Sequence, residues 1–237
     1  ALKAKGILLT TASGVHPNPI SETVFAMMLA WTRKLHMYIR NQQSSIWDHS
    51  GLRMELHGKT LLIAGVGAIG SEIARIAKAF DMKVIGIRRS GASAPNIDIM
   101  TTLERMSDHL PEADYIVNLL PNTGETHHVF DRRAFQAMKQ SAFFVNVGRG
   151  ATVDTEALVE ALRERTIGGA GLDVFEQEPL PPEHPLWRME EVIVTPHTAG
   201  STERYYERVM DIFLHNFESY SSGKLPTMNL VKYDLAY

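Results

Sequence analysis

Three polar residues with complementary chemistry each follow or end a short apolar run of the sequence: Arg149 stands in NVGRG, Glu178 follows DVF, and His197 ends TPH. If these runs are strands of an open parallel sheet, their carboxyl ends bring the three side chains to the edge where ligands bind. A guanidinium can hold a carboxylate, an imidazole can donate a proton to a carbonyl oxygen, and a carboxylate can orient and charge that imidazole. Each residue alone has an ordinary surface role, but the set predicts catalytic residues for the reduction of a 2-oxo acid.

A glycine-rich turn, GVGAIG at 65–70, follows the apolar run TLLIA and opens a helical pattern. In such a turn Gly65 permits the tight bend, Gly67 lets a pyrophosphate approach the backbone, and Gly70 lets helix and strand pack closely. The amides near Ala68 and Ile69 would face the phosphates at the positive end of the helix. The strand-turn-helix context favours a nicotinamide dinucleotide site over a turn without a ligand.

The next apolar run ends on Arg88, Arg89 and Ser90. This position lies about 20 residues after the turn, where a site that prefers NAD usually places an acidic residue. Two guanidinium groups and a hydroxyl can bind a ribose 2′-phosphate, and no carboxylate in this stretch repels it. We therefore expect NADP, with NAD as the alternative cofactor. The other interpretation of the two arginines is a solvated strand end.

Apolar runs typical of strands alternate with amphipathic helical stretches along most of the chain. This alternation predicts an α/β fold: a Rossmann-type, doubly wound parallel sheet in a three-layer α/β/α arrangement. The proline-rich stretch 178–185 is expected to form a stiff surface loop. The expected strands cover residues 6–10, 60–64, 84–87, 115–119, 143–147, 170–174 and 192–194, and the expected helices cover 19–40, 71–80, 131–139, 155–165 and 201–221.

The composition is that of an ordinary globular protein. With 237 residues and a formal net charge of -3, the chain offers no basic stripe for nucleic acid or a membrane surface. It has no cysteine, and His16, His127 and His128 lack ligand spacing, so we expect no metal and a structural or solvated role for these histidines. The longest apolar run, 24–31, is far shorter than the ~20 residues that span a bilayer. We expect a cytoplasmic protein.

Five segments together resemble one family: GVGAIG (65–70), LPNTGET (120–126), NVGRG (146–150), DVFEQEP (173–179) and TPHTAG (195–200). They look like the D-isomer-specific 2-hydroxyacid dehydrogenases, and the likeness covers nearly the whole chain. The resemblance implies that Arg149 binds substrate, that His197 is the general acid/base, that Glu178 is its partner, and that Asp173 lies near the nicotinamide amide. With the turn and the second strand, the expected cofactor-binding set is Gly67, Ala68, Ile69, Arg88, Arg89, Ser90, Leu120, Pro121, Thr126, Val147, Gly148, Arg149, Asp173, His197 and Gly200.

The resemblance also implies a division into domains. Residues 1–14 would be a remnant of a substrate domain, 15–205 the dinucleotide-binding domain, and 206–237 a C-terminal helix and tail that return to the substrate domain. The first part of the substrate domain is then expected to be missing from a truncated chain. If the chain were complete, the three catalytic residues would face open solvent and catalysis would be weak.

The implied reaction is hydride transfer between NADP(H) and a small 2-oxo acid or D-2-hydroxy acid. Within the family, Glu178 disfavours formate oxidation, and the absence of an extra regulatory domain disfavours phosphoglycerate dehydrogenase. A glyoxylate/hydroxypyruvate reductase is the enzymatic alternative. From a different class, the chain could be a non-catalytic dinucleotide-sensing dimerisation module, like the corepressors that share this fold.

A homodimer is also expected from the resemblance, because the long helix predicted over 19–40 helps to build the two-fold dimer in the family. This helix carries Val24, Met27, Met28 and Trp31, which is more apolar surface than one face needs. Packing within the chain is the alternative use of that surface.

Overall fold

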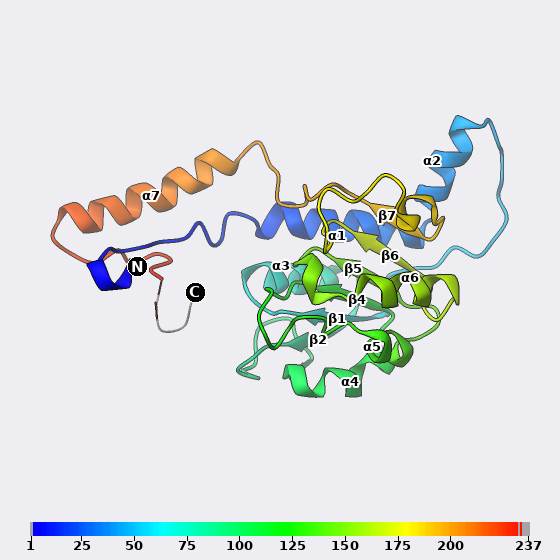
Figure 1. Ribbon diagram of the computed structural model, residues 1–237, viewed down its shortest axis with the longest axis horizontal. Helices are drawn as coiled ribbons and strands as arrows, with labels where there is room; N and C mark the ends of the chain where they lie inside the picture. Colours follow the sequence, from blue (N-terminus) through cyan, green and yellow to red (C-terminus); the bar gives the residue numbers. More distant parts are fainter. Residues whose placement is uncertain (1, 232, 234–237) are drawn as a thin grey trace.

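Seven parallel strands form one sheet in the structure, a computed structural model that describes residues 2–231 and 233 (Figure 1). The strands are β1 (Thr60–Ala64), β2 (Lys83–Ile87), β3 (Ile99–Thr101), β4 (Tyr115–Asn118), β5 (Phe143–Asn146), β6 (Gly169–Leu172) and β7 (Val192–Val194). They lie in the order β3-β2-β1-β4-β5-β6-β7, so the direction of winding reverses between β1 and β4. Such a reversal leaves a crevice at the carboxyl ends of the strands, which is the usual ligand site. The predicted doubly wound sheet is confirmed.

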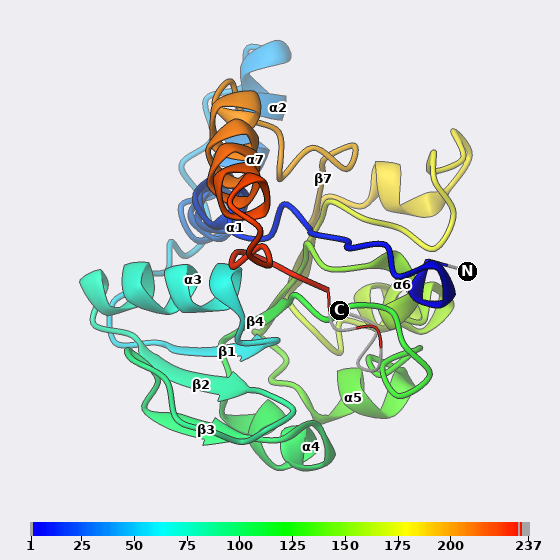
Figure 2. The ribbon, with the colours of Figure 1, turned by 90° about the vertical axis from the view of Figure 1, so that its left-hand side faces the viewer.

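Helices cover both faces of this sheet (Figure 2). On one face lie α1 (Pro17–Thr32) and α3 (Ala68–Ala79), and on the other lie α4 (Met106–His109), α5 (Arg132–Ala137) and α6 (Thr155–Arg163). α2 (Leu35–Gln43) follows α1, and α7 (Tyr205–Ser221) extends beyond the sheet (Figure 1). Short 3-10 helices lie at Lys3–Lys5, Leu103–Arg105, Leu110–Glu112, Gly150–Thr152 and Pro185–Arg188.

The central strands are buried on both faces, which explains their continuous apolar sequences. In β1, Leu61 belongs to the core cluster under α1 and α3, while Leu62 belongs to the cluster on the opposite face. In β5, the ring centroid of Phe144 lies 4.9 Å from that of Phe130 and 5.4 Å from that of Phe135. Truncating a buried phenylalanine of this kind to alanine costs about 3–5 kcal/mol. The two clusters therefore fix the sheet from which the loops of the crevice project.

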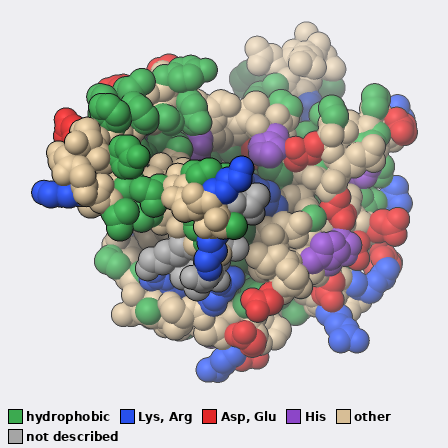
Figure 3. Space-filling view, turned by 60° about the vertical axis from the view of Figure 1, so that its left-hand side comes forward, with side chains coloured by type: hydrophobic (Ala, Val, Ile, Leu, Met, Phe, Trp, Pro, Cys, Tyr) green, Lys and Arg blue, Asp and Glu red, His purple; other side chains and the backbone are tan. Residues whose placement is uncertain are grey.

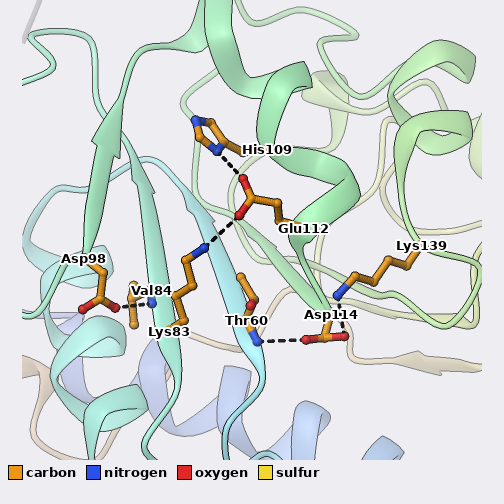
Figure 4. Close-up of polar contacts among 8 residues, drawn as sticks. All are labelled: Thr60, Lys83, Val84, Asp98, His109, Glu112, Asp114 and Lys139. Carbon is orange, nitrogen blue, oxygen red and sulfur yellow. Dashed lines mark hydrogen bonds and ion pairs between the residues drawn. The ribbon is translucent and has the colours of Figure 1, made fainter.

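Carboxylates hold the amino-terminal ends of the strands, at the edge opposite the crevice (Figure 4). Asp114 accepts hydrogen bonds from the backbone N–H of Thr60 and from Nζ of Lys139, both at 2.9 Å. Asp98 accepts a hydrogen bond of 2.7 Å from the backbone N–H of Val84. The starts of β1 and β2 are thus fixed by polar contacts that take no part in the crevice.

The single helix predicted over 19–40 is wrong, because the chain forms two helices with a break between them. Lys34 has a left-handed backbone conformation, with φ at 61°, and this residue ends the run of helical hydrogen bonds. The turn places Nζ of Lys34 4.3 Å from the ring centroid of Trp31 and stacks His36 on the same ring. The apolar side chains of α1 are buried within the chain, among them Val24 and Met28 at 0% exposure. Packing within the chain therefore accounts for that apolar surface.

The strand predicted over 6–10 is not formed, since only Thr10 makes a bridge, antiparallel to Leu230. Ile7, Leu8 and Leu9 are exposed, because no sheet lies beside them to cover an apolar run. Of the C-terminal segment expected at 206–237, residues 232 and 234–237 lie outside the described residues. Hydrophobic side chains gather on the surface of α7 (Figure 3), namely Tyr206, Met210, Phe213, Leu214, Phe217 and Tyr220.

The other predicted elements are present with shifted ends. α3 begins at Ala68 instead of residue 71, α7 begins at Tyr205 instead of residue 201, and α5 and α6 are shorter than predicted. β3 was not predicted, because a run of three residues is too short to show a period. Within the described part of the chain, no helix is both long enough and apolar enough to cross a membrane.

Candidate active site

A cavity of about 590 Å³ lies at the carboxyl ends of the strands. The segments after β4, β5, β6 and β7 each contribute to its wall, together with α1 and the residue before it, α3 and the start of α7. Many of the predicted site residues line it, namely Ile69, Leu120, Pro121, Val147, Gly148, Arg149, Asp173, His197 and Gly200. Gly67, Ala68, Arg88, Arg89, Ser90, Thr126 and Glu178 are not part of this lining.

The glycine turn between β1 and α3 has the geometry that an anion site requires. Gly65 has φ at 109°, which favours glycine, and a Cβ on Gly70 would lie 2.6 Å from the carbonyl oxygen of Gly65. A Cβ on Gly67 would meet only open space, so the backbone at the start of α3 can be approached closely from outside. The free N–H groups at the start of a helix favour a phosphate group there. The turn fits the pyrophosphate of a dinucleotide.

The three residues after β2 form an exposed end with positive charge. Arg88, Arg89 and Ser90 are all exposed, and the backbone N–H of Arg88 bonds the carbonyl oxygen of Thr101 at 3.0 Å. The Ser90 hydroxyl accepts a hydrogen bond from the backbone N–H of Ala92 at 3.3 Å, which forms a turn. The adenosine ribose of a dinucleotide on the glycine turn would reach this strand end. The cationic side chains suit a phosphate on that ribose.

Thr126 closes the loop that follows β4. Its buried hydroxyl donates a hydrogen bond to the carbonyl oxygen of Pro121 at 2.5 Å and accepts one from the backbone N–H of Thr123 at 2.8 Å. The side chain is thus directed into its own loop, while Pro121 lines the cavity. Any effect of Thr126 on a ligand passes through the position of Pro121.

Arg149 lies at the mouth of the cavity with an exposed side chain. Its Nη1 donates a hydrogen bond of 2.7 Å to the carbonyl oxygen of Gly148. The next residue, Gly150, packs against the loop that follows β6, and a Cβ on Gly150 would lie 1.9 Å from the carbonyl carbon of Phe175. Since no side chain fits there, the loops that carry Arg149 and Glu178 are in direct backbone contact.

Glu178 and His197 form a hydrogen-bonded pair. Oε2 of Glu178 lies 2.7 Å from Nδ1 of His197, and Oε1 accepts a 2.9 Å hydrogen bond from the backbone N–H of Phe175. Partial burial raises the pKa of Glu178, but the hydrogen bonds from His197 and Phe175 and the charge of Arg149 outweigh burial and lower the pKa. The carboxylate is therefore ionised near neutral pH, and the pairing through Nδ1 leaves Nε2 of His197 for a ligand.

Asp173 holds the loop that carries His197. The side chain is buried, and its carboxylate accepts hydrogen bonds from the Thr195 hydroxyl at 2.6 Å and from the backbone N–H groups of Thr198 at 2.9 Å and Ala199 at 3.0 Å. The backbone N–H of His197, whose φ is 54°, donates to the carbonyl oxygen of Asp173 at 2.8 Å. Asp173 borders the cavity, but its carboxylate oxygens already bind this loop.

Glu176 makes contacts near the Glu178 loop that the sequence did not reveal. Its Oε1 lies 2.6 Å from Nε2 of His128, and its Oε2 accepts a 2.8 Å hydrogen bond from the backbone N–H of Thr155 at the start of α6. Burial raises the pKa of Glu176, but these hydrogen bonds outweigh burial and lower it. The side chain joins three loops at the edge of the crevice and steadies the segment that ends at Glu178. The sequence signal is weak, because it consists only of a second glutamate in FEQEP.

His16 and Tyr205 also line the cavity and were not among the predicted site residues. His16 precedes α1 and Tyr205 begins α7, so the two come from opposite ends of the chain. Their rings are stacked with centroids 5.6 Å apart. No spacing rule links residues so far apart, and only the fold brings them together. Within the described residues, no group of three or more His, Asp or Glu side chains is placed to hold a metal ion.

Known proteins that are similar to this chain belong to one family. A model of the D-isomer specific 2-hydroxyacid dehydrogenase NAD binding domain matches residues 25–199. A glyoxylate reductase of Aeropyrum pernix is 38% identical over 234 residues, which are 95% of this chain and 70% of that protein.

Two solved structures are also similar to this chain. The structure of phosphoglycerate dehydrogenase from Lactobacillus plantarum has a TM-score of 0.78 at 38% identity and covers 98% of this chain and 75% of its own. The NADPH-dependent glyoxylate/hydroxypyruvate reductase of Sinorhizobium meliloti, in complex with NADP and sulfate, has a TM-score of 0.85 at 30% identity and covers 98% of this chain and 73% of its own.

Proposed function

This chain belongs to the D-isomer specific 2-hydroxyacid dehydrogenases, which are NAD(P)-dependent enzymes, and we propose that it reduces a small 2-oxo acid to a D-2-hydroxy acid with NADPH. The observation that carries the proposal is the 2.7 Å pairing of Glu178 with Nδ1 of His197, beside a cavity that Arg149 also lines. The proposed proton donor, His197, and the cation for the substrate, Arg149, thus line one space, and Glu178 holds His197 from outside that lining.

Each of these residues has a distinct task in the reduction. Arg149 binds the carboxylate of the substrate and draws electron density from the adjacent carbonyl. His197 donates the proton on Nε2 to the carbonyl oxygen, and Glu178 stabilises the imidazolium form that carries this proton. A bound nicotinamide would supply the hydride for the carbonyl carbon, so that the substrate gains one hydride and one proton in all.

NADP is the cofactor that the residues after β2 favour. Arg88 and Arg89 place two cations on an exposed strand end, with the Ser90 hydroxyl beside them. Bidentate contacts from arginine suit the 2′-phosphate, and no acidic side chain in this stretch suits the bare diol of NAD. The structure of the Sinorhizobium meliloti reductase with NADP supports the same choice.

Within this reaction class, two of the similar proteins point to glyoxylate and hydroxypyruvate as substrates. The Aeropyrum pernix relative is a glyoxylate reductase, and the Sinorhizobium meliloti neighbour is a glyoxylate/hydroxypyruvate reductase.

The assembly proposed here includes a second domain and a second copy of the chain. The exposed apolar surface of α7 supports the proposal that α7 and the segment before α1 pack against a substrate domain. A homodimer interface is proposed at α2 and the segment after it, where Ile39 is 60%, Trp47 95% and Leu52 81% exposed. Light scattering of the wild-type protein and of Trp47→Ser tests the dimer, because the variant should shift towards the monomer.

An activity assay separates this function from a purely dinucleotide-sensing module. NADPH consumption is measured with glyoxylate, hydroxypyruvate, pyruvate and a branched 2-oxo acid, and NADPH binding is measured by fluorescence in the same samples. We expect turnover with at least one acid and its loss in His197→Asn, with NADPH binding retained. Binding without turnover of any acid would exclude the enzyme and favour the sensing module.

A further inference from the structure

His16 lies on the wall of the active-site cavity, far from His197 in the sequence. It directly precedes α1, and its Nδ1 lies 3.1 Å from the carbonyl oxygen of Gly200. Its ring stacks on that of Tyr205, with the planes at 22° to each other. The segment that follows His197 therefore fixes the position of a second imidazole in the same cavity.

The hydrogen bond to Gly200 sets the chemistry of the His16 ring. A carbonyl oxygen can only accept, so Nδ1 carries the proton, and Nε2 of the neutral imidazole is an acceptor. Among the described residues, none forms a hydrogen bond with Nε2 of His16. His16 thus presents a fixed acceptor in the wall of the cavity, in addition to Arg149 and His197, which approach a 2-oxo acid as donors.

The backbone around His16 is held in place from the side of α7. Nη1 of Arg208 donates a 3.0 Å hydrogen bond to the carbonyl oxygen of Val15, a residue that is 1% exposed. The ring of His16 is stacked on Tyr205 and hydrogen-bonded to Gly200. His16 therefore has little rotamer freedom to lose when a ligand binds. The acceptor is therefore preorganised.

The charge of the cavity limits what His16 can recognise. Among the described residues that line it, Arg149 is the one arginine and no lysine is present. That guanidinium is needed for the carboxylate beside the reacting carbonyl, and among the described residues that line the cavity no other arginine or lysine can meet a second carboxylate or a phosphate on the substrate. A neutral donor, such as a hydroxyl group, matches the acceptor at Nε2.

We infer that Nε2 of His16 accepts a hydrogen bond from a hydroxyl group on C3 of the substrate. The protein then prefers 2-oxo acids that carry this hydroxyl, such as hydroxypyruvate, over pyruvate, which has a methyl group in its place. The inference rests on the proposed reduction of 2-oxo acids. It adds which group on C3 of the substrate the site prefers.

The test compares two substrates that differ by a single hydroxyl group. The value of kcat/KM is measured for hydroxypyruvate and for pyruvate with the wild-type protein, His16→Phe and His16→Asn, and the ratio of the two values is compared. Phenylalanine keeps a ring that can stack on Tyr205 but removes the acceptor, whereas the asparagine amide keeps an acceptor. His57→Phe is the matched control, because His57 lies outside the cavity.

We expect His16→Phe to lower the preference for hydroxypyruvate about five- to tenfold, which is the ordinary range for one hydrogen bond. The kcat/KM value for pyruvate should change less than the value for hydroxypyruvate, His16→Asn should retain part of the preference, and His57→Phe should retain all of it. An unchanged ratio in His16→Phe, or an equal fall for both substrates, would overturn the role of His16. A wild-type protein that reduces neither acid, nor any other 2-oxo acid, would instead overturn the proposed function.

Discussion

Nδ1 of His197 and Oε2 of Glu178 lie 2.7 Å apart, although the two residues follow different strands of the sheet. The other oxygen of Glu178 is bound by the backbone N–H of Phe175, and the backbone of His197 is bound by Asp173. Both partners are therefore held by their own loops as well as by each other. The proposed role of His197 as proton donor can therefore be tested one contact at a time.

Removal of the charge on Glu178 should weaken the reduction and change its pH dependence. In Glu178→Gln the protonated form of His197 loses a charged partner, so we expect the pH of half-maximal reduction to move to lower values. At neutral pH, kcat/KM should fall about ten- to hundredfold, the range for one hydrogen bond to a charged group. A pH profile of kcat/KM with a saturating concentration of NADPH measures both effects, and an unchanged midpoint would show that the pair has no role in proton transfer.

Glu176 should act on the reaction without touching the substrate. In Glu176→Ala the loop that ends at Glu178 loses its bonds to His128 and Thr155, so we expect kcat to fall about tenfold, because small misplacements of catalytic groups are costly. The pH profile should move in the same direction as in Glu178→Gln, and Glu176→Gln should restore part of the activity. Glu183→Ala, an exposed change on the same loop, is the control. A change in KM alone would argue against positioning.

Cofactor preference should depend on the charge at the end of β2. We expect Arg88→Asp to lower the affinity for NADPH relative to NADH about ten- to hundredfold, because a carboxylate repels the 2′-phosphate and binds the free diol. Dissociation constants for both cofactors, measured by fluorescence titration, give the ratio. Arg133→Asp on α5 makes the same change of charge away from the cavity and should leave the ratio unchanged. Equal ratios for Arg88→Asp and the wild type would remove the case for NADP.

Asp98 should support the stability of the fold only when it is ionised. The hydrogen bonds from Lys78 and from the backbone N–H of Val84 lower its pKa below the ordinary value of 3.8, against a smaller effect of burial. The contribution of Asp98 to the free energy of unfolding is therefore complete when the pH is above that ordinary value. It is lost as the pH falls through the lowered pKa. Asp98→Asn should cost about 1 kcal/mol near neutral pH, because the carboxylate is partly exposed.

The measurement is the free energy of unfolding by urea for the wild type and Asp98→Asn from neutral pH down to acidic pH. The difference between the two proteins should narrow only at acidic pH. The exposed pair of Asp108 with Arg105 supplies the control, and Asp108→Asn should have little effect at any pH. A difference that stays constant down to the lowest pH would contradict the role of the ionised carboxylate.

The features that the sequence predicts well are those set by local pattern. The turn at 65–70 combines three glycines with a preceding apolar strand, and each glycine meets a backbone constraint or an open approach in the structure. The alternation of buried strands and amphipathic helices likewise determines the sheet, since parallel strands need helical crossovers. The common cavity of Arg149 and His197 could be predicted because strand ends converge at one edge of such a sheet.

The features that the sequence misses are set by contacts between distant segments. Lys34, which lies between α1 and α2, has a left-handed conformation with no glycine or proline to mark it. The apolar residues 6–10 resemble a strand but meet only one bridging partner at Leu230. His16 and Gly200 are 184 residues apart, and Glu176 and His128 are 48 residues apart, so no periodic pattern could join them. Such pairs follow only from the packed fold.

The transfer of label from deuterated cofactor tests the central claim most directly. The protein is supplied with NADPH in which deuterium replaces the transferred hydrogen on C4 of the nicotinamide, together with glyoxylate, hydroxypyruvate or pyruvate. The product is analysed by chiral chromatography and mass spectrometry. We predict one deuterium on C2 of the 2-hydroxy acid. The products of hydroxypyruvate and pyruvate, whose C2 is a chiral centre even without the label, should have the D configuration. The rate should be about 100- to 10,000-fold lower in His197→Asn. Absence of label in any 2-hydroxy acid, an L product, or an unchanged rate in His197→Asn would contradict it.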